Sequence, residues 1–295
     1  MTASQQPAKA LVLGGGGTTG IAWEMGLLLG LHESGIDVTT ADLIIGTSAG
    51  SVVGAQITSG LPLEELYARQ LQPLEQTKEQ VVQFELAALF HVFTAGAGAP
   101  DAQTARARVG AAALAVKTMP EQERLEIIAA RLPAQAWPAR QRLVITTVDA
   151  QTGEEVFFDK DAAVPLTLAV AASCAVPGVY PPTSIGSHRY IDGGVRSGTN
   201  ADIAKGARRV LILRAEVLDV SAIEGMPATP HLTFEDELAA LQQSGAQTLV
   251  VTPDEASTAA RGPNPLDASR REVSARAGRT QGRQIAESVK RFWSA

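Results

Sequence analysis

The chain has 295 residues, of which 45% are hydrophobic, and its formal net charge is −6. This length and hydrophobic content are enough to bury a sizeable core, and we expect a single domain over residues 1–295. Acidic and basic residues are mixed along the sequence, which argues against a nucleic-acid-binding protein.

The first 60 residues predict two parallel strands joined by a helix. Residues 10–13 are an apolar strand, residues 14–20 are a glycine-rich loop, and apolar residues then recur at helical spacing. Residues 42–45 are a second buried strand, and the segment GTSAGS leads from it into a helix of small and apolar residues. A strand, helix and strand in this order form a right-handed parallel unit.

The rest of the chain predicts helices first and then further strands. Helix-favouring residues dominate 61–138, which we interpret as a helical insertion or cap. Strand patterns return at 142–150 and 155–159 and predict a hairpin. The later expected elements are a helix in 165–178, a strand in 189–194 that ends in a glycine turn, strands in 208–217 and 246–254 around a helix near 235–243, a loop with a helix in 254–281, and a closing amphipathic helix to Trp293. Strands that alternate with helices predict a three-layer α/β/α sandwich with a mostly parallel central sheet.

The single cysteine and the polarity of the chain bear on its compartment. Cys174 has no partner for an internal disulfide, and we interpret it as a small buried side chain. The N-terminus is polar, and no stretch reaches the ~18 apolar residues of a membrane span. We therefore expect a cytoplasmic protein, and peripheral contact with a lipid surface stays compatible with the sequence.

The glycine-rich segment GGGGTTG, residues 14–20, allows several interpretations. A dinucleotide loop, formally matched by Gly15, Gly17 and Gly20, needs a carboxylate near the end of the second strand, where this sequence has none. A mononucleotide loop needs Gly-Lys-Ser/Thr, and the segment has no lysine. An oxyanion hole needs backbone amides beside a helix N-terminus, and it needs a nucleophile nearby. A merely tight turn would need one or two glycines.

GTSAG, residues 46–50, supplies a candidate nucleophile. It has the Gly-x-Ser-x-Gly pattern between a buried strand and a helix, where a sharp turn exposes the serine hydroxyl. Both glycine motifs then lie at the carboxyl edge of one parallel sheet, where ligands bind. We predict that Ser48 is the nucleophile.

The base that would activate Ser48 has two candidates. Asp192, followed by two glycines, is a carboxylate at the end of a strand and could act as the base directly. His188 lies four residues earlier on the same strand, so both side chains share one face. The other histidines, which we interpret as structural or solvated, are His32, His91 and His231. A free aspartate has a pKa near ~3.9, so an Asp192 base needs burial to raise its pKa, or late proton transfer.

Four segments in this order resemble the patatin-like phospholipase family: GGGGTTG, GTSAG, AASCAVPGVYPP and DGG. The resemblance covers roughly residues 10–215 and implies a patatin-like fold with a Ser–Asp dyad and no histidine. Ser48 would be the nucleophile and Asp192 the base, and Asn200 matches a frequent family position. The backbone amides implied as oxyanion donors are those of Gly15, Gly16 and Gly17.

The resemblance implies a serine lipid acyl hydrolase of the phospholipase A or esterase type, acting on a lipid or acyl-ester substrate. No cofactor is expected, and the carboxylates and histidines show no metal-ligand spacing. Thr19 departs from the family, which usually has Arg or Lys before the last glycine of the loop. A weakly catalytic lipid- or acyl-binding regulator of the same fold is therefore an alternative, and a dinucleotide-binding enzyme is a further one. For the apolar stretch 81–93 we expect core packing, with an acyl-chain groove or lid as the alternative.

Overall fold

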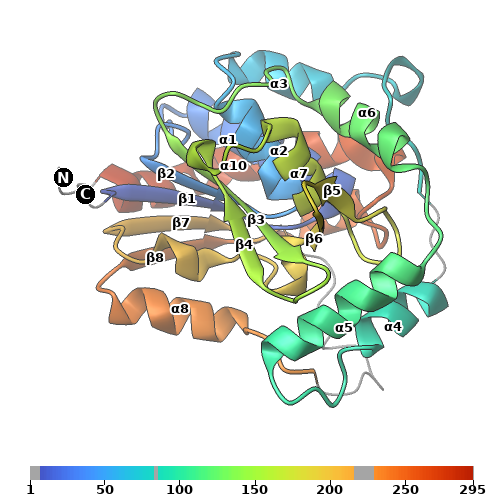
Figure 1. Cartoon of the computed structure of the whole chain (residues 1–295). Helices are drawn as coiled ribbons and strands as arrows, with labels where there is room; N and C mark the ends of the chain where they lie inside the picture. Colours follow the sequence, from blue (N-terminus) through green and yellow to red (C-terminus); the bar gives the residue numbers. More distant parts are fainter. Residues whose placement is uncertain (1–6, 83–85, 216–228, 295) are drawn as a thin grey trace.

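The computed structural model describes residues 7–82, 86–215 and 229–294, which are arranged around one mixed sheet (Figure 1). The strand order is β5-β6-β3-β2-β1-β7-β8, with β4 paired to β3. The strands are β1 Lys9–Leu13, β2 Leu43–Gly46, β3 Arg142–Asp149, β4 Glu155–Phe158, β5 Thr183–Ile185, β6 His188–Asp192, β7 Arg209–Leu213 and β8 Gln247–Val251. The pairings among β3, β2, β1, β7 and β8 are parallel, and those made by β4, β5 and β6 are antiparallel.

Helices cover both faces of this sheet. The helices are α1 Gly17–Glu33, α2 Ala49–Ile57, α3 Leu63–Gln70, α4 Leu86–Thr94, α5 Ala102–Ala115, α6 Glu121–Arg131, α7 Leu166–Ser173, α8 Phe234–Gln243, α9 Glu255–Arg261 and α10 Arg271–Ser294. On one face lie α1, α2, α7 and α10, and on the other lies α8 (Figure 1). The three-layer sandwich predicted from the sequence is confirmed.

Strand β1 shows why the predicted strands are continuous apolar runs. Its residues alternate between two cores: Leu11 and Leu13 pack with the α1 side, and Ala10 and Val12 pack with the α8 side. A central parallel strand is covered on both faces, so every position is apolar rather than every second one.

Three loops meet at the carboxyl end of β2: the glycine loop after β1, the GTSAG turn after β2 and the turn after β6. Gly46, the last residue of β2, pairs with Leu13 of β1 and with Ile145 of β3. Strand β6 runs antiparallel to β3 and ends with Asp192 opposite Thr147. Thr147 comes just after Ile145, the β3 residue that pairs with Gly46. The antiparallel direction of β6 therefore returns the chain to the end of β2, close to the GTSAG turn.

The segment 254–281 contains both a loop and helix, as expected, but the closing helix begins within it and not after it. Helix α10 starts at Arg271 and continues without a break to Ser294. Two glycines of α10 are contact points with α1: an added Cβ on Gly278 would lie 2.2 Å from the Trp23 carbonyl oxygen, and one on Gly282 would lie 2.3 Å from that of Leu27. Glycine here permits two helix backbones to touch, and that outweighs its low helix propensity.

The apolar stretch 81–93 is described only in part. Residues 83–85 lie outside the described part of the chain, and α4 begins at Leu86. Val92 is fully buried in a cluster with α5, β3 and β6, whereas Phe90 is exposed. Core packing therefore accounts for Val92, and the acyl-chain groove or lid stays a prediction. Among the described helices, none is both long enough and apolar enough to cross a bilayer.

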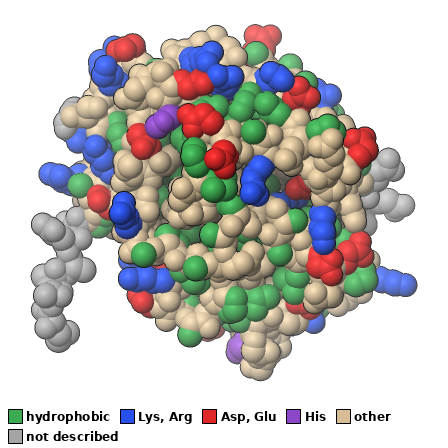
Figure 2. Space-filling view, turned by 90° about the horizontal axis from the view of Figure 1, so that it is seen from above, with side chains coloured by type: hydrophobic (Ala, Val, Ile, Leu, Met, Phe, Trp, Pro, Cys, Tyr) green, Lys and Arg blue, Asp and Glu red, His purple; other side chains and the backbone are tan. Residues whose placement is uncertain are grey.

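Charged side chains are mixed over the face shown in Figure 2. Lysine and arginine side chains lie beside aspartate and glutamate side chains, and hydrophobic side chains lie between them. The mixing of charges read from the sequence therefore also holds in space on this face.

Candidate active site

Ser48 occupies a strained turn between β2 and α2. Its φ of 52° is in the left-handed region, which a residue with a Cβ adopts only when its surroundings enforce it. An added Cβ on Gly46 would lie 2.6 Å from the Gly50 carbonyl oxygen, and one on Gly50 would lie 2.0 Å from that of Leu13. The glycines on either side of the serine are therefore required by backbone contacts.

The backbone of Ser48 is fixed by three side chains. Its N–H donates to the Ser173 hydroxyl at 2.9 Å, and its carbonyl oxygen accepts from the Ser51 hydroxyl at 2.6 Å and the Cys174 thiol at 3.2 Å. Cys174 is buried as expected, and burial raises the pKa of its thiol, which keeps the proton that it donates. Ser173 was not foreseen, although a serine inside an apolar helix was a usable signal.

Asp192 is a buried carboxyl at the end of β6. Its Oδ1 accepts from the Gly194 N–H at 2.7 Å, and its Oδ2 has no hydrogen-bond partner of standard geometry among the described residues. Burial raises its pKa to about 7; the Gly194 N–H, the Ser48 hydroxyl and the Arg124 charge lower the pKa by less. The Ser48 hydroxyl is thus a neighbour of this carboxyl, and catalytic hydrogen bonds are often long before substrate binds.

Asn200 links the serine turn to the aspartate turn. Its side-chain N–H groups donate to the Thr47 hydroxyl at 3.0 Å and to the Gly193 carbonyl at 3.2 Å, which are next to Ser48 and Asp192 in the sequence. The side chain also donates to the Ser197 carbonyl at 2.7 Å and to the Thr146 hydroxyl at 3.4 Å, and its oxygen accepts from Arg196 at 2.8 Å. Asn200 is fully buried with a φ of 53°. Its hydrogen bonds therefore hold the turn at Ser48 and the turn after Asp192 in a fixed relative position.

The glycine loop presents two amides beside the N-terminus of α1. The N–H of Gly15 donates to the Gly198 carbonyl at 2.8 Å, so in this conformation it is engaged and is not open to a substrate. The N–H groups of Gly16 and Gly17 have no acceptor of standard geometry among the described residues. The structure thus differs from the expectation for Gly15 and leaves the other two amides available.

Close backbone contacts explain the run of glycines in this loop. An added Cβ would lie 3.0 Å from the Leu213 carbonyl oxygen on Gly14, and 2.8 Å from the Ala215 carbonyl oxygen on Gly16. On Gly17 it would lie 2.4 Å from the Pro265 carbonyl oxygen, and Gly17 also has a φ of 63°. One or two glycines would therefore not suffice.

A cation reaches the glycine loop from α9. Arg261 donates through Nη2 to the Gly16 carbonyl at 3.1 Å and through Nε to the Thr19 hydroxyl at 3.4 Å. Burial lowers its pKa to about 10, partly offset by Glu24, so the guanidinium stays charged at neutral pH. The loop therefore has a cation although Thr19 replaces the usual one. No local pattern could have revealed it, because Arg261 is distant in the sequence.

A small cavity adjoins the Ser48 side chain. It measures about 10 Å³, room for a single water molecule. Its other lining residues are Gly17, Thr18, Ile21, Ala49, Arg124, Arg131, Cys174, Val176, Tyr180 and Leu266. Arg124, which the sequence did not point to, is buried with its guanidinium carbon 3.5 Å from the centre of the Tyr180 ring. A molecule larger than water must move some of these side chains to reach the serine.

No histidine lines this cavity in the described part of the chain. The ring of His188 bonds to Asp149 at 2.6 Å, and its side chain is half exposed. His188 as the base of Ser48 is therefore wrong. Among the described residues, no group of three or more His, Cys, Asp or Glu side chains could hold a metal ion.

The fold and this site define an α/β protein with a serine at a strained strand-to-helix turn and a buried aspartate beside it. The family model of the patatin-like phospholipases matches residues 11–205, and the chain belongs to that family. This assignment replaces the dinucleotide-binding alternative.

The chain is also similar to solved structures of larger proteins. VipD from Legionella pneumophila is 13% identical with a TM-score of 0.45, and the match covers 97% of this chain and 67% of VipD. Type III effector ExoU is 19% identical with a TM-score of 0.38, over 96% of this chain and 54% of ExoU. ExoU from Pseudomonas aeruginosa in complex with SpcU is 18% identical with a TM-score of 0.42, over 99% and 54%. The chain thus spans about half the length of ExoU.

Proposed function

We propose that this protein is a serine lipid acyl hydrolase that cleaves carboxylic esters, with Ser48 as nucleophile and Asp192 as base. One observation carries the proposal: a serine in a strained, tightly held turn is a neighbour of a buried carboxyl whose pKa is about 7. Membership of the patatin-like phospholipase family supports the substrate class.

The proposed reaction has two acyl-transfer steps. Asp192 accepts the proton of the Ser48 hydroxyl as its oxygen attacks the ester carbonyl, and the alcohol leaves with that proton. Water then attacks the acyl-enzyme and Asp192 accepts a proton from it; the bond between the acyl carbon and the Ser48 oxygen breaks, Asp192 returns the proton to that oxygen, and the fatty acid is released. The Gly16 and Gly17 amides are proposed to hold the tetrahedral oxyanion, beside the positive end of the α1 dipole.

The raised pKa of Asp192 is what suits it to this work. A carboxyl with a pKa of about 7 is partly ionised at neutral pH and is a stronger base than an ordinary aspartate. Two free amides can add to the effect, since losing one oxyanion donor typically costs about 10² to 10³ in kcat.

Hydrolysis of p-nitrophenyl esters of graded chain length tests the proposal. We expect turnover by the wild type and none by Ser48→Ala. The small volume of the cavity beside Ser48 favours the second candidate, a lipid- or acyl-binding regulator. That candidate predicts acyl binding without turnover, and equal background rates in both proteins would contradict the hydrolase.

Arg261→Gln is expected to lower kcat about tenfold with little change in KM. The guanidinium that holds Gly16 and Thr19 is lost, so the loop moves but its amides are not removed, and the loss is smaller than for a missing donor. Steady-state kinetics with p-nitrophenyl butyrate measure this, and Arg261→Lys should recover part of the rate. An unchanged kcat in a folded Arg261→Gln protein would show that the arginine does not position the loop.

A further inference from the structure

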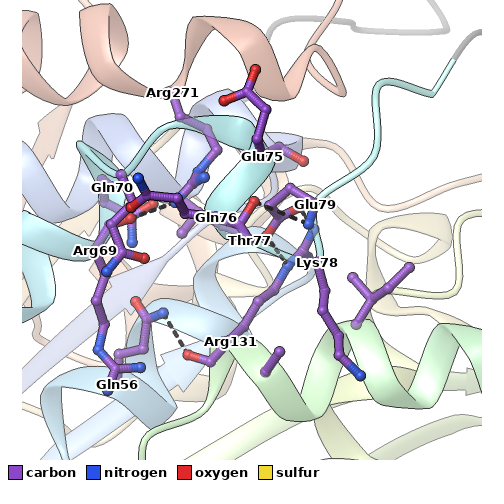
Figure 3. Close-up of a pocket in the computed structure, with 15 residues that line it drawn as sticks. Gln56, Arg69, Gln70, Glu75, Gln76, Thr77, Lys78, Glu79, Arg131 and Arg271 are labelled. Atoms are coloured by element: carbon purple, nitrogen blue, oxygen red, sulfur yellow. Dashed lines mark hydrogen bonds and ion pairs between the residues drawn. The ribbon is translucent and has the colours of Figure 1, made fainter.

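A second, larger cavity adjoins the Ser48 cavity and has a different character. It measures about 360 Å³ and lies among α1, α2, α3, α6 and the start of α10 (Figure 3). The two cavities share Thr18, Ile21 and Arg131 in their walls. A group in the larger cavity would therefore be next to a group bound at Ser48. Its volume is in the range of small-molecule sites.

Cations outnumber anions in this larger cavity, although the whole chain is acidic. The basic lining residues are Arg69, Lys78, Arg131 and Arg271, and the acidic ones are Glu75 and Glu79. Arg131 and Glu79 form a bidentate ion pair at 2.8 and 2.7 Å and neutralise each other. Lys78 pairs with Glu126 at the surface.

Arg69 and Arg271 are the cations without a carboxylate partner within ion-pair distance among the described residues. Arg271 is buried, and one of its Nη groups donates to the Arg69 carbonyl. Glu79 attracts it at longer range, but burial outweighs this and lowers the pKa of the guanidinium. The other N–H groups of Arg271 form no hydrogen bond of standard geometry in the described part of the chain. A buried guanidinium with free donors is a site for an anion.

The remaining wall offers neutral hydrogen-bonding groups. Glutamines and threonines predominate: Gln56, Gln70, Gln72, Gln76, Thr18 and Thr77. Among the lining residues that the structure describes, three are apolar: Ile21, Ile127 and Ala130. An acyl chain here would leave the polar groups of the wall without partners, which costs free energy. The wall suits a polar, negatively charged group.

We propose that this cavity binds the phosphate-bearing, anionic headgroup of the lipid whose ester reaches Ser48. The inference rests on the proposed function and specifies that the lipid substrate carries an anionic, phosphate-bearing headgroup. Arg271 and Arg69 would contact the phosphate, and the glutamines would contact the hydroxyls of the headgroup. The ester would then lie on the side of the shared wall residues Thr18, Ile21 and Arg131 that faces Ser48.

The test compares phosphatidylglycerol with phosphatidylcholine of the same acyl chains in mixed micelles. We expect the wild type to prefer phosphatidylglycerol in kcat/KM, and Arg271→Gln to lower that preference about tenfold because a charge-assisted contact is lost. Arg271→Lys keeps the charge and should retain most of the preference. Arg276→Gln, an exposed arginine on the same helix, is the matched control and should leave the preference unchanged. Circular dichroism melts check that each variant is folded.

Calorimetric titration on the Ser48→Ala background provides a readout without turnover. Glycerophosphoglycerol should bind, and Arg271→Gln should abolish the binding. An unchanged lipid preference in folded Arg271→Gln would overturn the proposal, and if inorganic phosphate then binds as well as glycerophosphoglycerol, the cavity is a free-phosphate site. If the wild type cleaves no ester, the proposed hydrolase fails, whereas loss of glycerophosphoglycerol binding in Arg271→Gln would still support the anion site.

Discussion

Asp192→Asn is expected to lower kcat for ester hydrolysis by about 10² to 10⁴, the range that a general base contributes. Asparagine keeps an oxygen for the Gly194 N–H, so the turn after β6 is retained, but the amide cannot accept the serine proton. The loss should therefore fall on kcat and not on KM. Asp161→Asn, which changes an exposed aspartate on the surface, is the control.

The pH profile adds a sharper form of this prediction. A base works only when it has lost its proton, and burial raises the pKa of Asp192 to about 7. The wild-type kcat/KM should therefore rise about tenfold per pH unit below that value and level off above it. The residual rate of Asp192→Asn should lack this limb. A wild-type limb near pH 4, or the same limb in the variant, would mean that another group takes the proton.

Gly50→Ala is expected to destabilise the protein by at least about 3 kcal/mol and to remove the activity. The new Cβ would lie 2.0 Å from the carbonyl oxygen of Leu13, which belongs to β1 in the centre of the sheet. Neither backbone can move without disturbing the sheet or the serine turn. Urea unfolding measures the loss, and the p-nitrophenyl butyrate assay reports the site.

Gly20→Ala is the matched control for the Gly50 variant. The added Cβ would meet its nearest neighbours, Ala49 and Arg261, at an ordinary 3.5 Å, and Gly20 lies inside a helix where alanine is favoured. Its free energy of unfolding should stay within about 1 kcal/mol of the wild type. Equal stability of both variants would contradict the claim that contact with β1 fixes the glycine of the turn.

Local sequence patterns were enough to predict the sandwich and to place Ser48 and Asp192 at one edge. The strands before the glycine loop and before GTSAG are short apolar runs, and the glycines mark where the backbone turns or is in close contact with another segment. Segment 271–281 shows what glycine positions alone do not reveal: Gly278 makes the same kind of contact, but inside a helix that packs on α1. A glycine in the sequence indicates a close backbone contact. Only the folded structure shows whether that contact lies in a turn or between two packed helices.

The charged residues around the site were beyond sequence reasoning. Arg124, Arg261 and Arg271 come from three helices far from the glycine motifs in the sequence. Each is buried, and each is an ordinary helix residue by local pattern. What distinguishes them is the group they face in the folded chain. The anionic headgroup site that we propose thus depends on residues that no motif contains.

Reaction with a fluorophosphonate, followed by mass spectrometry of tryptic peptides, tests most directly the claim that Ser48 is an activated nucleophile. If Asp192 activates Ser48, we expect a single adduct on Ser48, no adduct in Ser48→Ala, and a labelling rate that rises with pH through about 7 in the wild type. An adduct on another residue, or equal labelling of the wild type and Ser48→Ala, would contradict it.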